Sequence, residues 1–437
     1  MIFICFFWFL LLYGGVYYIF KKEDLFSPIK FVCLKFAVFN LPFILYTAFN
    51  PITFPHSILK VCGSNLNDAF LKYSIIQTLA FVSLIAGILL LKKIKPVFPT
   101  PKPVHFDYKK LRILSFVLFG IGLSAYFIFL SRIGGLMYLL THLDQRVALQ
   151  SGQYVLTLLP LLSLSCLLMM QCVKLENKIQ DKILLILFSL LTIAVFSSFG
   201  ARKNALYFCL ALLIGYHYII GGLRFTRKTI SIVAVLFVVF FAYIIVIPQI
   251  REHNDLNKKI SDYKVNTKFY IYNTSYAFID IFAANYFNKD NAWFMKGYFA
   301  PAIVPFTNTD KKNLPQVDQG VYFNSIVKYQ KNFEPPLPRN QLSNASWPTE
   351  NFGFAYANFL LPGIVVFFVL QGIVFALAYY YLIRQKYNPV IILIYTLVII
   401  DFNFSSLRIV SFIKLLPLLL FAYIIVKKVT QNTRLFK

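Results

Sequence analysis

The sequence TISIVAVLFVVFFAYIIVIPQIREHND, residues 229–255, contains the boundary that decides how this chain folds. An unbroken apolar run ends at Pro248, and the polar residues Arg251 and His253 follow almost at once. The run is long enough to cross roughly 30 Å of hydrocarbon, whereas the residues after it require water. Sustained apolar sequence returns only near the end of residues 249–352, so the chain carries one large polar loop between two membrane-spanning regions.

Composition assigns most of the remaining chain to the membrane. Of the 437 residues, 59% are hydrophobic and 14% are charged, whereas a soluble protein carries about a quarter charged residues. We therefore expect an all-α polytopic integral membrane protein, because a helix satisfies its own backbone hydrogen bonds in lipid. The apolar runs predict about eleven spans, at residues 2–20, 28–49, 70–91, 111–130, 153–172, 183–199, 204–222, 229–248, 355–383, 388–404 and 407–426. The expected organisation is spans one to eight in residues 1–248, the large loop in residues 249–352 between spans 8 and 9, and the last three spans with a tail in residues 353–437.

The basic residues predict how the spans are oriented. Lys and Arg gather in alternate connections, and connections of this kind lie on the cytoplasmic side of a membrane. The alternation predicts a cytoplasmic C-terminus, an extracytoplasmic N-terminus and an extracytoplasmic large loop. The same distribution accounts for the net charge of +26 without nucleic acid, which we do not expect as a partner. The basic connections are residues 21–30, 92–112, 174–182, 224–228, 384–386 and 427–437.

Several basic residues depart from this pattern, because they fall on the predicted extracytoplasmic side. Most of them are arginines, whose planar guanidinium binds phosphate and carboxylate through two hydrogen bonds. They predict an anion site at the outer membrane surface. Each of them can instead contact a lipid headgroup or pair with an acid such as Asp144 or Asp401. The set consists of Arg132, Arg146, Arg202, Lys203, Arg251, Arg339 and Arg408.

Two segments concentrate this anion-binding pattern. Residues 197–204 form a tight turn in which Gly200 permits the reversal, and Arg202 and Lys203 precede the next helix. A helix N-terminus presents free N–H groups, so the two cations there predict a phosphate-sized site, or alternatively a plain hairpin turn. Residues 131–147 predict a short amphipathic helix at the membrane interface, which either covers a lipid-linked substrate or acts as a surface anchor.

The large loop contains the acid and base candidates. It holds nine of the 17 Asp and Glu residues, which favours chemistry outside the cytoplasm. His253 follows a span and is the side chain most easily used as a base near neutral pH. Asp280 lies in an aromatic, amphipathic stretch expected at the membrane surface, where it is either catalytic or simply solvated. Glu350 precedes a span, where it serves either as a base or as an acid that complements the helix dipole.

The sequence contains neither a Cys and His cluster nor a nucleotide-binding or zinc-protease motif, so it predicts no metal and no cofactor. Four short motifs, taken in order, resemble the Wzy-type polymerases that join oligosaccharide repeat units in bacterial O-antigen and capsule assembly. The resemblance covers most of residues 110–375. Its motifs are Arg132-Ile133-Gly134-Gly135-Leu136 with Arg146, then Gly200-Ala201-Arg202, then Arg251 after a span, and finally the loop with Gly297-Tyr298, Pro301 and Pro305 that ends in Trp347-Pro348, Glu350, Tyr356-Ala357-Asn358-Phe359 and Gly363.

The resemblance implies a GT-C-like helical fold in the bacterial inner membrane and a glycosyltransferase of lipopolysaccharide or capsule biosynthesis. The donor would be a glycan on undecaprenyl diphosphate, and the acceptor would be the non-reducing end of one repeat unit on the same lipid. The extracytoplasmic basic set would bind the diphosphate, and His253, Asp280 or Glu350 would take the acceptor proton. It implies a metal-independent reaction, with membrane lipids and a chain-length regulator as partners.

Two other functions fit parts of the same sequence. An O-antigen ligase shares the architecture and the need to bind a lipid diphosphate. A flippase for lipid-linked oligosaccharides would instead show paired halves, short loops and charges along a central cavity. The single large loop and the uneven spacing of the spans favour an enzyme over the flippase.

Overall fold

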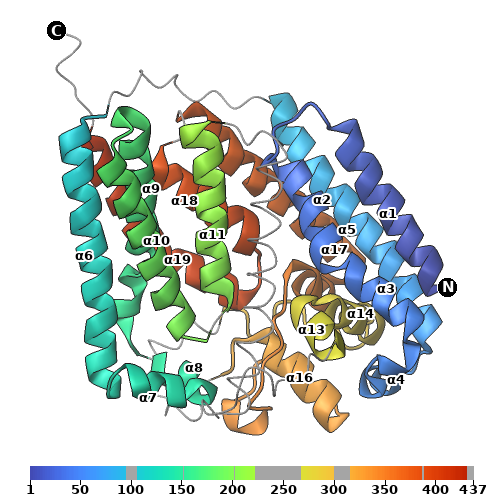
Figure 1. The fold of residues 1–437 in the computed structure, drawn as a ribbon. Helices are drawn as coiled ribbons and strands as arrows, with labels where there is room; N and C mark the ends of the chain where they lie inside the picture. The colour runs from blue at the N-terminus through green and yellow to red at the C-terminus, as the bar shows by residue number, and fades with distance from the viewer. Residues whose placement is uncertain are drawn as a thin grey trace. The chain divides into compact units, whose positions relative to one another are not determined.

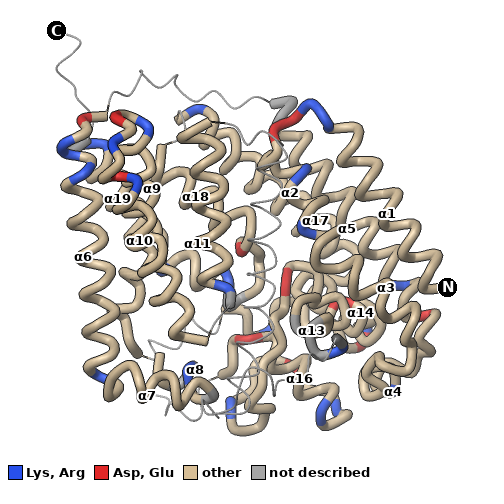
Figure 2. The backbone as a smooth tube through the Cα atoms, in the orientation of Figure 1, with Lys and Arg blue, Asp and Glu red and all other residues tan. Residues whose placement is uncertain are grey.

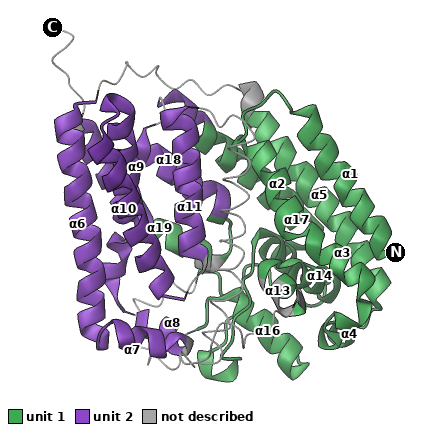
Figure 3. Cartoon of the chain, viewed as in Figure 1, with its two compact units in different colours: residues 1–97, 267–379, 401–413 green, residues 98–266, 380–400, 414–437 purple. Residues whose placement is uncertain are grey.

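The computed structural model describes residues 1–94, 106–150, 152–200, 202–221, 267–299, 315–385 and 388–430. These residues are almost entirely helical, and the β-structure found within them is one isolated bridge between Pro315 and Pro338. They divide into two compact units that each combine segments from distant parts of the sequence (Figures 1 and 3). Unit 1 contains residues 1–97, 267–379 and 401–413, and unit 2 contains residues 98–266, 380–400 and 414–437.

The expected multi-pass, all-helical architecture is confirmed over the described residues. They include nine helices or helix pairs that are long and apolar enough to cross a membrane. The expected span at residues 229–248 lies outside the described residues, and the one at residues 388–404 is a 13-residue helix, α18 (Pro389–Asp401). The nine are α1 (Ile2–Ile19), the pair α2 (Pro28–Phe39) and α3 (Leu41–Phe49), α5 (Leu66–Ile94), α6 (Tyr108–Ile133), α9 (Pro160–Glu176) with the turn before it, α10 (Ile179–Ser198), α11 (Arg202–Gly215) with the turn after it, α17 (Asn351–Arg384) and α19 (Ser406–Thr430).

In unit 2, α9 lies against α6, α10 and α11 and is buried around most of its circumference. Ser115 of α6 donates a hydrogen bond to the carbonyl of Ser165 at 2.9 Å, which allows the two helices to approach closely. Charged residues gather where α6 begins, α9 ends and α10 begins (Figure 2). There Arg112 and Tyr108 both bond the buried carboxylate of Asp181, at 3.0 and 2.7 Å. Connections that are predicted to lie on the same side of the membrane therefore meet at one end of this unit.

In unit 1, α5 packs against α1 and α2, and its backbone touches that of α17. A Cβ atom at Gly87 would lie 2.1 Å from the carbonyl oxygen of Val369. A Cβ at Gly372 would lie 2.2 Å from the carbonyl oxygen of Leu84. Two glycines that face opposite backbones form the small-residue contact that stabilises helix pairs in lipid, where hydrophobic burial adds little.

We expect Gly87→Ala to destabilise unit 1, because the added methyl group meets a backbone carbonyl that has no freedom to rotate away. Overpacking of this kind costs about 1–3 kcal/mol, which thermal unfolding of the purified protein in detergent measures as a lower Tm. Gly15→Ala in α1 is the matched control, since no described heavy atom lies within 4 Å of a Cβ there. Equal Tm values for the two variants would contradict the close helix contact.

The described part of the large loop is folded and packs within unit 1. It contains α13 (Thr267–Thr274), α14 (Ala277–Tyr286) and α16 (Gln319–Tyr329), and α14 lies against α5 and against the short helix α4 (His56–Cys62). Phe287 and Phe323 have ring centroids 5.0 and 5.4 Å from that of Trp293, which is fully buried. α14 buries most of its side chains against other helices, and the expectation that residues 270–287 lie on the membrane surface stays a prediction.

The span expected at residues 355–383 is present in α17, but it is interrupted near its start at Leu360, where φ is 53° and ψ is −137°. Pro362 has no N–H to donate to the carbonyl of Asn358, so the helix cannot continue through this point. Asn351 nevertheless donates a hydrogen bond to Oε1 of Gln371 at 3.0 Å, 20 residues later. A straight helix would separate these residues by about 30 Å, so the chain reverses and residues 351–359 form a short helix folded back on the longer one.

Backbone amides from the large loop satisfy the carbonyls that this break exposes. The amide of Trp293 donates to the carbonyl of Ala357 at 2.8 Å, and that of Phe294 donates to the carbonyl of Asn358 at 3.1 Å. The amide of Met295 donates to Oδ1 of Asn358 at 2.8 Å. Buried backbone groups without partners are costly, particularly near lipid. The loop therefore stabilises the folded-back helix at its C-terminal end.

Candidate functional site

The folded-back helix begins at a cluster of charged residues in unit 1. Lys35 lies on α2, within an apolar span, and its Nζ is 3.4 Å from Oε2 of Glu350, which directly precedes the folded-back helix. The two residues are 315 positions apart in the sequence. Lys35 was recognisable in the sequence as a charge inside a span, but its partner was not. The structure therefore joins an intramembrane lysine to one of the predicted loop acids.

Stability alone is a poor explanation for this pair. A lysine at the centre of a span costs about 2.5–3.5 kcal/mol on insertion scales. The side chains of Lys35 and Glu350 are 34% and 42% exposed, and ion pairs this open contribute at most about 1 kcal/mol. An ionisable residue within a span that is not explained by stability is a candidate for function.

Asp280, a second predicted acid, interacts with the same pair. It lies on α14 and is partly exposed, yet burial is the largest cause that raises the pKa of its carboxyl well above the usual value. The negative charge of Glu350 raises this pKa further, whereas Lys35 and a hydrogen bond from the backbone N–H of Gly353 lower it. Asp280 is therefore partly buried rather than fully solvated. Two carboxyl groups in different environments are the arrangement that separates an acid from a base.

The segment that leads into Glu350 is fixed to α16. The amide of Trp347 donates to the carbonyl of Gly320 at 3.1 Å, and Ser346 Oγ donates to Oδ2 of Asp318 at 2.6 Å. A Cβ at Gly320 would lie 1.7 Å from the carbonyl oxygen of Trp347, so only glycine permits this approach. These contacts hold the chain three and four residues before Glu350, which positions its carboxylate.

Asp318 forms a second charged cluster in unit 1. Burial raises the pKa of its carboxyl, while hydrogen bonds from Ser346 and from the Gly320 N–H, and the nearby charges of Arg408 and Arg339, lower it. Both arginines belong to the predicted anion-binding set. Arg408 also pairs with Asp401 through an Nε–Oδ1 distance of 3.4 Å, the acid contact anticipated as the alternative to anion binding. Arg339 donates to the carbonyl of Asn344 at 2.8 Å.

Unit 2 contains the other described members of the basic set. Arg146, on α8 (Arg146–Gln150), donates from Nη1 to the carbonyl of Gly200 at 2.8 Å. The predicted amphipathic helix, observed as α7 (Leu136–Thr141) followed by short turns and α8, therefore contacts the turn that precedes Arg202. Lys203 Nζ lies 5.1 Å from the ring centroid of Tyr207. Two of the motifs thus meet in one place.

The remaining members of the basic set are Arg132, Arg202 and Arg251. Arg132 donates to Oε1 of Gln153 at 3.3 Å on an exposed surface. Arg202 is the first residue of α11, and its side chain lies outside the described part of the structure. Arg251 and His253 both lie outside the described residues, so their predicted roles stay predictions.

Sequence reasoning singled out Asp280 and Glu350 but not the residues that organise them. In the sequence, Lys35 is a charged residue within an apolar span, and Asp318 is one of the nine loop acids. For Lys35, the one available signal in the sequence was a lysine inside an apolar span. No signal indicated that Asp318 lies near Arg339 and Arg408, because that arrangement depends on how the loop folds.

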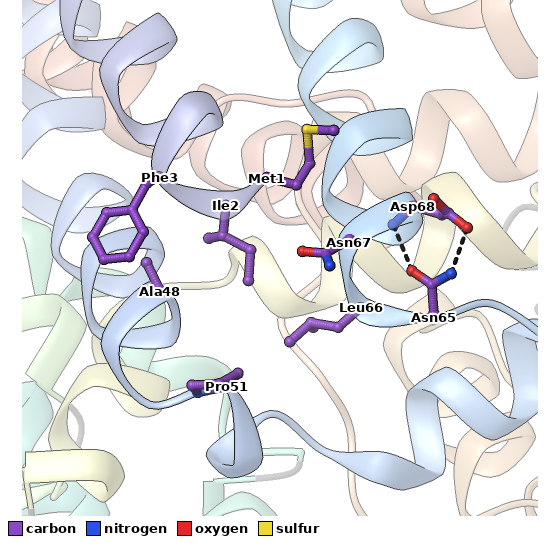
Figure 4. A pocket seen from close by; sticks show the side chains of 9 residues that line it. All are labelled: Met1, Ile2, Phe3, Ala48, Pro51, Asn65, Leu66, Asn67 and Asp68. Atoms are coloured by element: carbon purple, nitrogen blue, oxygen red, sulfur yellow. Dashed lines mark hydrogen bonds between the residues drawn. The ribbon is translucent and has the colours of Figure 1, made fainter.

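A cavity of about 620 Å³ opens in unit 1 where α1 and α5 begin and α3 ends (Figure 4). Its lining is largely apolar and includes Ile2, Phe3 and Leu66. The polar members bond each other, since Asn65 Nδ2 donates to Oδ2 of Asp68 at 2.6 Å. No predicted site residue lines this cavity, so it does not supply the candidate chemistry.

The described residues define a class of protein: an all-helical, multi-pass membrane protein whose large loop brings acids to an intramembrane lysine. Within the described ranges, no group of three His, Cys, Asp or Glu side chains is arranged to hold a metal ion. Comparisons with protein-family models, with curated proteins and with solved structures gave no match for this chain. The function must therefore be inferred from the chain itself.

Proposed function

We propose that the protein polymerises lipid-linked oligosaccharide repeat units at the outer face of the bacterial inner membrane. In this proposal it transfers a glycan from undecaprenyl diphosphate to the non-reducing end of a repeat unit on the same lipid. The fold is GT-C-like, the large loop and the N-terminus are periplasmic, and the C-terminus is cytoplasmic. Membrane lipids surround the spans, and a chain-length regulator is the expected protein partner.

The proposed reaction needs one base and one anion site. The acceptor hydroxyl oxygen forms a bond to the anomeric carbon of the donor glycan, and the bond from that carbon to the diphosphate oxygen breaks. The electron pair of the broken bond stays with the lipid diphosphate, and the hydroxyl proton passes to a carboxylate. Arginines stabilise the charge that develops on the leaving group, because preorganised cations act most strongly where charge appears in the transition state.

The observation that carries the proposal is the cluster of Lys35, Glu350 and Asp280. It combines a residue inside a span with two acids from the loop predicted to be extracytoplasmic. In this proposal, the lipid diphosphate of the donor and the acceptor sugar meet at this cluster. The resemblance of the ordered motifs to Wzy-type polymerases supplies the reaction class.

A gel of surface polysaccharide from a deletion strain, with and without the gene on a plasmid, tests the function. We expect the ladder to collapse to a band of core plus one repeat unit, and the plasmid to restore it. Loss of all surface glycan would overturn the polymerase and favour the ligase or the flippase. Lipid-linked intermediates separate these two, since a ligase-deficient cell still accumulates polymerised lipid-linked chains.

A further inference from the structure

The proposed reaction, as described so far, gives no role to Lys35. It lies within hydrogen-bonding reach of Glu350, at 3.4 Å, and its charge also acts on Asp280. Glu350 is held from its other side by the segment fixed to Gly320. The Asp280 carboxyl, in turn, accepts a hydrogen bond from the N–H of Gly353. Three charged groups from a span, a loop helix and a helix start thus constrain one another.

We propose that Lys35 is a positioning residue of the transfer site: its ion pair with Glu350 fixes that carboxylate, so that Glu350 takes the acceptor proton. This inference rests on the proposed function and assigns the base among the candidates. Two acids close together retain one proton more readily than none, because two negative charges repel. Protonated Asp280 can then donate a hydrogen bond to a sugar hydroxyl, and Glu350 can accept one.

Other groups near Asp280 act in the same environment. Tyr13 of α1 and Tyr73 of α5 interact electrostatically with Asp280. Tyr73 is fully buried, and among the described residues its hydroxyl has no hydrogen-bond partner. The charged and titratable side chains on the elements around α14 include Tyr13 of α1, Cys33 and Lys35 of α2, Cys62 of α4, Lys72 and Tyr73 of α5, and Glu350. Of the charged side chains in this set, Lys35 and Glu350 act directly on Asp280.

Infrared titration of the purified full-length protein in lipid nanodiscs tests the arrangement without any substrate. A protonated carboxyl group gives a carbonyl-stretch band. The band that is present in the unsubstituted protein and absent in Asp280→Asn belongs to Asp280. Lys35→Gln should shift the midpoint of that band to higher pH, because a positive charge that favours the carboxylate is lost. Glu350→Gln should shift it to lower pH, because a repelling negative charge is lost. An opposite charge within about 4–6 Å moves a carboxyl pKa by about 1–3 units.

Lys72→Gln is the matched control, because Lys72 acts on Cys62 and not on Asp280. It should leave the Asp280 band in place. Opposite shifts for Lys35→Gln and Glu350→Gln would support the inference even if the polymerase assay failed. Unchanged midpoints in both variants would overturn it even in an active polymerase. In the polymerisation assay, Lys35→Arg should retain more activity than Lys35→Met, because arginine preserves the ion pair.

Discussion

Replacing Glu350 with glutamine is expected to abolish the polysaccharide ladder while leaving the protein in the membrane. Glutamine keeps the shape of the side chain but cannot take the acceptor proton. Loss of a general base lowers a rate by about 10²–10⁴-fold. The measurement is chain elongation on lipid-linked repeat units with purified protein, together with the surface-polysaccharide gel and an immunoblot for protein level.

Glu334→Gln provides a matched control for this loss. Glu334 is also a loop acid paired with a lysine, Lys296, and its side chain is 42% exposed, as is that of Glu350. Its ion-pair partner is a loop lysine rather than a lysine within a span, so we expect normal chain lengths. A normal ladder in Glu350→Gln would exclude Glu350 as the base and direct attention to Asp280 and His253.

The second large effect is expected at the extracytoplasmic arginines. Arg202→Ala and Arg251→Ala should each abolish polymerisation without loss of expression, because each removes a cation from the leaving diphosphate. Removal of one preorganised donor from a developing negative charge costs about 10²–10³-fold in rate. The same elongation assay measures this, with donor and acceptor both at saturating concentration.

Arg224→Ala is the control for the arginine variants, because Arg224 belongs to a connection predicted to be cytoplasmic. It should leave chain lengths unchanged. We also expect polymerisation to persist in EDTA, since the arginines supply the positive charge. Normal ladders in Arg202→Ala and Arg251→Ala would remove the anion-site model, and activity lost in EDTA and restored by a divalent ion would overturn metal independence.

The sequence predicted the spans well because lipid imposes one simple requirement, a long apolar helix, on each of them. It did not show where a span is interrupted. Residues 28–49 read as one segment but form α2 and α3, with Pro42 at the junction. Residues 355–383 also read as one segment, although the chain reverses at Leu360. Hydropathy is the same on both sides of each break, so it carries no information about direction.

The candidate site was predictable only in part. Asp280 and Glu350 attract notice as loop acids next to apolar sequence, and Lys35 attracts notice as a charge within a span. Their meeting depends on the fold of α14 and on the reversed start of α17, and neither leaves a periodic trace in the sequence.

The distance in sequence between Lys35 and Glu350 has a consequence for how the protein is made. A ribosome that adds about 5–20 residues per second needs about 15–60 s to synthesise the 315 positions that separate them. During that interval the second hydrophobic segment is already leaving the translocation channel with its ammonium group and without this carboxylate. The ion pair between Lys35 and Glu350 can therefore form only after most of the chain has been synthesised.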